Sequence, residues 1–143
     1  MSCLTFPSSW NWMPSKPHIT HTFTINDNNR IEKVLMTFTR INTAHRSQYV
    51  DFAQTTIITQ LNEELYHIVE KDTKVGDISN DNGDGFYFMG TDEYWSSESS
   101  DWPYVMRCMY VGEKYMLEMT VLCYGKDSTT IKESFELLQN PTI

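Results

Sequence analysis

The sequence contains no run of about 20 apolar residues, the length that a membrane-spanning helix requires. Its first 17 residues also lack the basic start and the apolar stretch of a secretory signal. Only three cysteines are present, and Cys108 and Cys123 fall too far apart along a predicted hairpin to reach disulfide geometry. An odd number of unpaired thiols is typical of a reducing compartment. We therefore expect a cytoplasmic protein with no membrane insertion.

Basic residues are scarce and scattered. Eleven lysines and arginines stand against 19 aspartates and glutamates, which gives a net charge of −8. Nucleic-acid binding needs clustered Lys and Arg to neutralise phosphates, so a nucleic-acid partner is not expected. At 143 residues, the chain is long enough for one domain with a substantial core, and residues 1–143 are interpreted as a single domain.

The common catalytic fingerprints are also missing. The sequence has no GxSxG, P-loop or dinucleotide-binding motif. Cys108 and Cys123 lie within predicted strands, where a structural thiol is the expected role. Because no nucleophile is found with a matching base, we predict a protein that is not an enzyme and has no cofactor.

Two groups of residues raise the question of a metal site. Asn80, Asn82 and Asp84 match the first positions of a calcium loop, but position twelve is Thr91 where a bidentate Glu is needed. Asn, Asp and Gly also favour tight turns, and a turn is the preferred interpretation. His18 and His21 would point to opposite faces of a strand, so they cannot share a metal. No metal site is predicted.

The stretch from residue 103 to residue 124 is the most informative. Two runs rich in Val, Tyr, Met and Leu flank Gly112-Glu113, which predicts a β-hairpin with a two-residue type II′ turn. Closure by Val111 and Lys114 would place Tyr110 opposite Tyr115. One face of this hairpin is wholly apolar and is predicted to be buried.

Alternating patterns predict further strands at residues 18–25, 34–41 and 86–89, with a short one near Val75. Ser47 can cap a long helix that runs to about Glu70, and residues 126–131 begin a final helix. Residues 134–138 either extend that helix or form a strand. The order predicts the α+β class: an antiparallel β-sheet packed on one face by a long α-helix and a short C-terminal helix.

Element order and a few positions resemble the PsbP-like superfamily, and within it the bacterial DcrB and Eag proteins. The positions that carry this resemblance are Pro7, Trp10, Leu117, Thr120, Ser134 and Phe135. The resemblance implies a non-enzymatic binding fold. Eag proteins are cytoplasmic chaperones, commonly dimers, that hold apolar segments of type VI secretion effectors against the open sheet face. The long N-terminal segment and the Ser-rich acidic loop depart from that pattern.

The second face of the hairpin mixes apolar and charged residues, and flexible methionines suit surfaces that accept varied apolar partners. We predict that this face binds a protein partner, namely an apolar segment of a secreted bacterial type VI effector. Six residues form the predicted surface: Arg107, Met109, Met116, Glu118, Leu122 and Tyr124. Alternatively, the N-terminal segment with Trp10 and Trp12 covers this face. A homodimer is a further possibility.

The alternative function is that of an immunity protein, which neutralises a toxin by blocking its active site. The predicted docking surface is then the acidic, aromatic loop at residues 91–102, where charge would speed association and tryptophans would anchor it. Its candidate residues are Asp92, Glu93, Trp95, Asp101 and Trp102.

Overall fold

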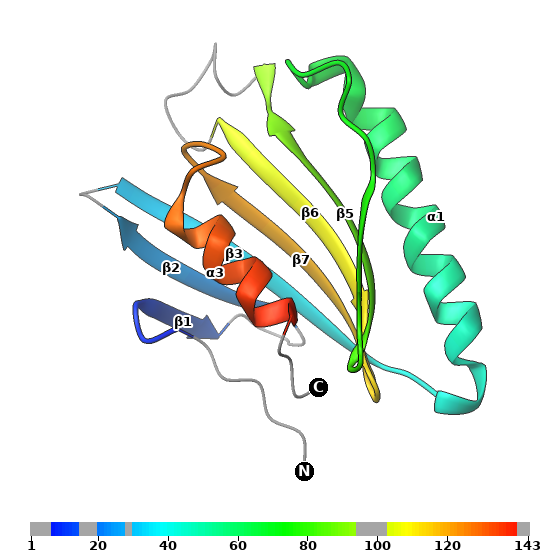
Figure 1. Ribbon diagram of the computed structural model, residues 1–143. Helices are drawn as coiled ribbons and strands as arrows, with labels where there is room; N and C mark the ends of the chain where they lie inside the picture. The colour runs from blue at the N-terminus through cyan, green and yellow to red at the C-terminus, as the bar shows by residue number, and fades with distance from the viewer. Residues whose placement is uncertain (1–6, 15–19, 28–29, 94–102, 140–143) are drawn as a thin grey trace.

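A seven-stranded antiparallel sheet forms the centre of the computed structural model (Figure 1), which describes residues 7–14, 20–27, 30–93 and 103–139. The strands are β1 (Trp10–Pro14), β2 (Thr20–Asp27), β3 (Arg30–Arg40), β4 (Gly76–Asn80), β5 (Gly83–Thr91), β6 (Tyr104–Val111) and β7 (Tyr115–Cys123). The helices are α1 (Arg46–Glu64) and α3 (Thr129–Gln139), with the short 3-10 helices η1 (Thr43–His45) and η2 (Leu65–His67). The predicted α+β class is confirmed.

The sheet consists of two meanders joined edge to edge. Its strand order is β1-β2-β3-β7-β6-β5-β4, so every neighbouring pair except β3 and β7 is also consecutive along the chain. The joint between the meanders pairs Lys33 with Leu122 and Arg40 with Tyr115. The first and last thirds of the chain therefore meet at the middle of the sheet.

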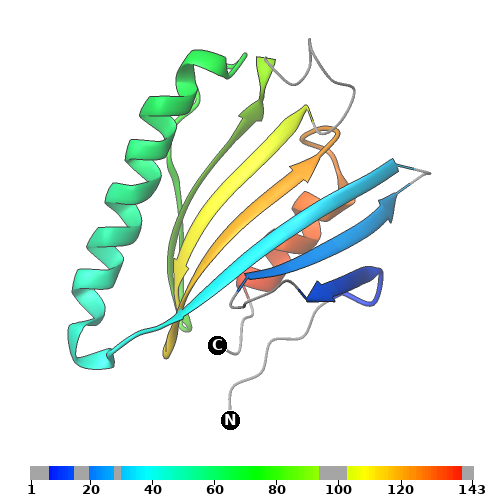
Figure 2. The same ribbon diagram turned by 180° about the vertical axis from the view of Figure 1, so that it is seen from behind.

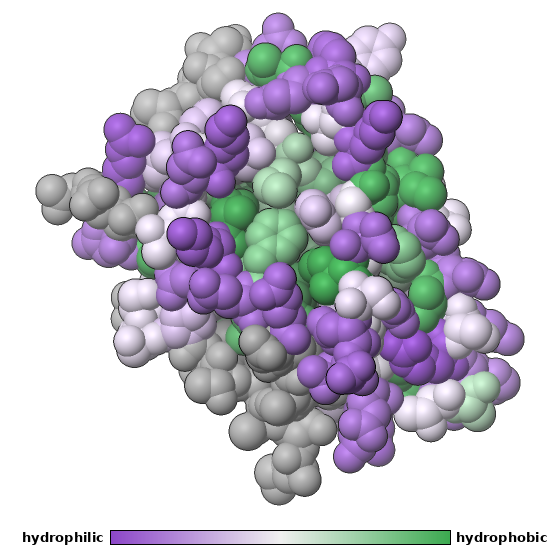
Figure 3. Space-filling model, viewed as in Figure 1, coloured by the Kyte–Doolittle hydropathy of each residue, from purple (hydrophilic) through white to green (hydrophobic). Residues whose placement is uncertain are grey.

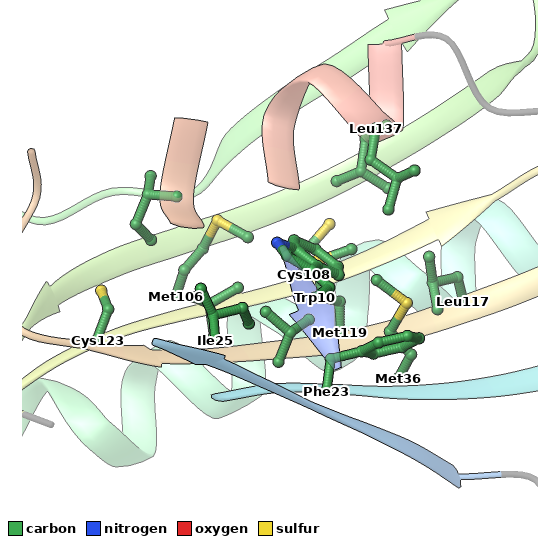
Figure 4. Close-up of a cluster of buried hydrophobic side chains, with 14 of the residues drawn as sticks. Trp10, Phe23, Ile25, Met36, Met106, Cys108, Leu117, Met119, Cys123 and Leu137 are labelled. Atoms are coloured by element: carbon green, nitrogen blue, oxygen red, sulfur yellow. The ribbon is translucent and has the colours of Figure 1, made fainter. Parts of the chain in front are cut away.

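The two helices lie on opposite faces of this sheet. Ala53, Ile57 and Leu61 of α1 form one buried cluster with β5 and β6. The other cluster contains Ile131, Leu137 and Leu138 of α3 on the opposite face. Figure 4 shows α3 on one side of the strands and α1 on the other. The prediction that both helices pack on one face is corrected here, because β6 is apolar on both faces and both need cover.

Trp10 belongs to the cluster on the α3 side, where its ring lies 5.4 Å from that of Phe23 (Figure 4). It therefore does not cover the second hairpin face, and the side chain of Trp12 lies outside the described ones. On the same side, the rings of Tyr87 and Phe135 pack edge to face at 4.9 Å. Figure 3 shows this side of the molecule, with apolar side chains gathered near its centre and polar ones around them.

The long helix is shorter than predicted. α1 ends at Glu64, and the chain tightens into η2 instead of continuing to Glu70. The Lys71 ammonium donates to the backbone oxygens of Leu65 (3.0 Å) and Tyr66 (3.2 Å), which satisfies carbonyls at this helix end. After η2, Ile68 is buried and pairs with Asp92 in an isolated bridge.

The C-terminal helix extends through residues 134–138, which excludes a strand there. The Ser128 hydroxyl accepts a hydrogen bond from the Thr130 amide at 3.1 Å, in the manner of an N-cap. Ser134 is fully buried, and its hydroxyl donates to the Thr130 carbonyl at 2.7 Å. This bond satisfies a polar group that α3 presses against the sheet.

The hairpin between β6 and β7 forms as predicted, but its turn is longer. Val111 pairs with Met116 and Tyr110 with Leu117, a register shifted by two residues from the predicted one. The Gly112 amide donates to the Tyr115 carbonyl at 2.8 Å and closes the turn. Because side chains alternate with a period of two, this shift changes every partner but leaves every side chain on its predicted face.

Candidate functional site

The predicted partner surface divides into a covered part and an open part. Met109 and Met116 are only 2% and 9% exposed, because both lie in the cluster beneath α1. The prediction that these methionines offer contact area is corrected. The apolar side chains of α1 must pack against an apolar surface, and the part of this sheet face that carries Met109 and Met116 is that surface.

Arg107 contacts α1 rather than Glu118. Its Nε lies 2.6 Å from Oε1 of Glu64, which makes an ion pair without the alignment of a hydrogen bond, and its Nη1 lies 3.3 Å from the Thr120 hydroxyl. The predicted register, closed by Val111 and Lys114, would place Glu118 opposite Arg107. In the observed register Glu118 faces Met109 and is exposed. Burial raises the pKa of the Glu64 carboxyl, and the Arg107 guanidinium offsets only part of that effect.

The remaining part of this sheet face has no described helix over it. α1 packs against β5 and β6, and Figure 2 shows β2, β3 and β7 with no helix in front of them. We call this surface the open half-face. Its side chains come from alternate positions of three strands: Thr22, Thr24, Ile31, Lys33, Leu35, Thr37, Glu118, Thr120 and Leu122.

Three apolar side chains occupy neighbouring positions on the open half-face. Leu122 pairs with Lys33, so Ile31 and Leu35 are its two diagonal neighbours on β3. Ile31 is 50% exposed, and Leu35 and Leu122 are half-buried. We call these three residues the Leu122 patch. Sequence reasoning found Leu122 and missed the other two, although the alternation along residues 31–37 places both on one face.

The last predicted residue of this surface, Tyr124, lies just beyond the end of β7. The Arg30 guanidinium stands over its ring at 4.8 Å from the centroid. Together with its loop, Tyr124 lines a pocket at the end of the sheet rather than the open half-face. The six predicted residues are therefore distributed over three environments.

The acidic loop proposed for toxin binding is described only at its start. Asp92 is half-buried and Glu93 is exposed, and the Asp92 amide donates to the Pro103 carbonyl at 2.7 Å. Trp95, Asp101 and Trp102 lie outside the described residues. The immunity hypothesis therefore stays a prediction from the sequence.

The calcium-like segment is a tight turn between β4 and β5. The Asn80 side-chain oxygen accepts bonds from the amides of Asn82 and Gly83 and from the Tyr110 hydroxyl. The Asp84 carboxylate accepts from Ser79 and pairs with Arg46 at 3.2 Å. The side-chain oxygens of Asn80 and Asp84 therefore stabilise the turn and its neighbours. Within the described part of the chain, no group of three His, Cys, Asp or Glu side chains could hold a metal ion.

The two described cysteines are buried, Cys108 in the cluster on the α3 side of the sheet and Cys123 at the end of β7. Burial raises the pKa of each thiol to about 12, which disfavours the thiolate that a nucleophile needs. The structural role predicted for both is consistent with this environment.

Comparisons with protein-family models, with curated proteins and with solved structures found no match. None of the helices in the described part of the chain is long and apolar enough to cross a membrane.

Proposed function

We propose that this chain is a non-enzymatic binding protein that holds an apolar segment of a partner protein against the open half-face. The observation that carries the proposal is the Leu122 patch, an apolar cluster on a sheet face that no described helix covers. Apolar side chains gathered on one exposed surface commonly mark an interaction site.

The rest of the open half-face suits an apolar segment that runs along the strands. Thr22 and Thr37 flank Leu35 on neighbouring positions, and Thr20 and Thr37 join their hydroxyls at 2.9 Å. Threonines on strands present methyl groups, and the long side chain of Lys33 stands between Ile31 and Leu35, so the partner meets a surface of methyl groups with one charged side chain among the apolar ones. The exposed carboxylate of Glu118 at its margin would orient polar groups of the partner.

The partner class favoured by the resemblance to Eag proteins is a secreted bacterial type VI effector. In that role the chain is a cytoplasmic chaperone or adaptor that hides an apolar effector segment until export. Met109 and Met116 are buried and cannot contact an effector. The Leu122 patch supports this role because it offers accessible apolar area on the same sheet face.

The test is co-expression with a candidate effector encoded beside this chain, followed by affinity purification of the complex. Leu35→Asp and Leu122→Asp should each reduce recovery of the effector at least tenfold, because a carboxylate placed in an apolar contact loses well over 1.4 kcal/mol. Both side chains are half-buried, so circular dichroism must first show that each variant is folded.

Phe52→Asp supplies the matched control. Phe52 is 54% exposed on α1, away from the open half-face, and this variant should bind like the unaltered chain. Undiminished recovery with folded Leu35→Asp and Leu122→Asp would refute the proposal, and so would an equal loss with Phe52→Asp.

A further inference from the structure

A polar pocket lies at the end of the sheet, away from the open half-face. It has a volume of about 520 Å3 and is lined by Arg30 and Glu32 of β3 and by the loop from Tyr124 to Ser128. That volume is within the range of small-molecule sites, roughly 300–1,000 Å3. The loop connects β7 to α3, so the pocket is built by two segments from opposite halves of the chain.

Glu32 forms the floor and holds this loop in place. Glu32 is only 1% exposed, yet both of its carboxylate oxygens have hydrogen-bond partners. Oε1 accepts bonds from the hydroxyls of Ser128 (2.5 Å) and Thr130 (2.7 Å), and Oε2 accepts one from the Tyr124 amide (2.9 Å). These three hydrogen bonds satisfy the buried carboxylate and fix the loop against β3.

The rim carries both signs of charge. The Arg30 guanidinium is held over the Tyr124 ring, and no hydrogen bond from its N–H groups is found among the described residues. Lys126 and Asp127 are exposed at the same opening, and neither is in an ion pair within the part of the chain that is described. The lining thus presents two cations, Arg30 and Lys126, and two anions, Glu32 and Asp127.

This balance selects against a ligand of one charge. A simple anion would meet Glu32 and Asp127, and a simple cation would meet Arg30 and Lys126, so either gains little net attraction. A molecule with both charges can satisfy each group. We infer that the pocket binds a small zwitterion with a carboxylate and an ammonium group, of the class of the free α-amino acids.

In this arrangement the ligand carboxylate accepts bonds from Arg30 and Lys126, since arginine presents a fork of donors that matches a carboxylate. The ligand ammonium donates to the exposed carboxylate of Asp127, and the buried charge of Glu32 beneath the loop adds to the attraction. A Cβ placed on Gly125 would meet no atom within 4 Å, so the loop leaves open space there for the side chain of the ligand. The pocket is separate from the open half-face, so the result of a ligand-binding test does not depend on the proposed function.

The test is isothermal titration calorimetry of the full chain with free L-amino acids, each tested singly. Acetate and methylammonium serve as probes of a single charge. At least one amino acid should bind at least tenfold more tightly than either single-charge probe. Arg30→Gln and Asp127→Asn should each weaken that binding about tenfold, the effect of losing one charge-assisted contact.

Arg40→Gln is the matched control, because Arg40 is an exposed arginine at the other end of the same strand. It should leave affinity unchanged. The inference is overturned if no amino acid gives heat, if acetate binds as tightly as the best amino acid, or if Arg30→Gln has no more effect than Arg40→Gln. Since Arg30 and Asp127 are at the surface, both variants should stay folded, which circular dichroism checks.

Discussion

The two halves of the sheet face on the α1 side have different compositions although β7 contributes side chains to both. Beneath α1, the contacts are Phe88, Met109 and Val111 packed on Ala53 and Ile57, all nearly inaccessible. On the open half-face, threonines surround the Leu122 patch, and Ile31 is half exposed. The Arg107–Glu64 pair stands at the boundary between them. The difference shows how one continuous face can supply core on one side and surface on the other.

The largest difference in unfolding free energy should appear between two variants that each place a carboxylate in one of the two halves. Met109→Asp buries a carboxylate beneath α1 with no partner, and we expect a loss of more than about 3 kcal/mol of unfolding free energy. Leu35→Asp on the open half-face should cost less than about 1 kcal/mol, since its side chain can reach water. Urea denaturation measures both, and equal losses would remove the distinction between the halves.

The next effect compares two adjacent positions on α1. Ile57 is fully buried, and Ile57→Ala should cost about 2–5 kcal/mol through lost burial and the cavity left behind. Ile58 is 42% exposed, and Ile58→Ala should change stability by no more than about 0.5 kcal/mol. Thermal unfolding of the two variants compares them. A small loss for Ile57→Ala would mean that α1 does not cover the sheet as tightly as the structure shows.

The smallest effect concerns the boundary pair. Arg107→Met should cost about 1 kcal/mol, because both side chains of the ion pair are about one third exposed and solvent screens them. The pKa of Glu64 is raised in the folded state, so its contribution falls as pH rises from its ordinary 4.5 through the raised folded-state value. Unfolding free energies over a pH series that begins below 4.5 should show this decline.

Glu64→Gln is the control for that decline, since it removes the titrating group and should flatten this part of the profile. Arg107→Met should instead steepen it, because burial of Glu64 is then uncompensated. An unchanged profile in Glu64→Gln would assign the decline to other groups.

Much of the fold could be predicted because the strands alternate clearly and α1 repeats apolar residues at helical spacing. The face of each hairpin residue was also predictable, since a register error of two residues preserves it. The side on which α1 packs was not. β6 offers Cys108 and Tyr110 on one face and Met109 and Val111 on the other, and local sequence does not say which face receives which helix.

The candidate site was harder to predict for the same reason. Methionines such as Met109 and Met116 are common both in cores and on partner-binding surfaces. Only the position of α1 shows that these two belong to the core. The pocket around Glu32 was missed because its parts are far apart in the chain, and a single Glu between Ile31 and Lys33 on a strand resembles a solvent-facing residue. Tyr124 was found, but for a different surface.

The joint between β3 and β7 also has a consequence for the kinetics of folding. Five of the six strand pairings follow from local turns or short connections, whereas β3 and β7 must meet across α1 and the whole second meander. Closing so long a loop is entropically costly, so we expect this pairing to limit the folding rate. Val34 pairs with Val121 at this joint, and both are inaccessible. In stopped-flow refolding, Val34→Ala should slow folding more than it speeds unfolding, and the reverse would place the joint after the rate-limiting step.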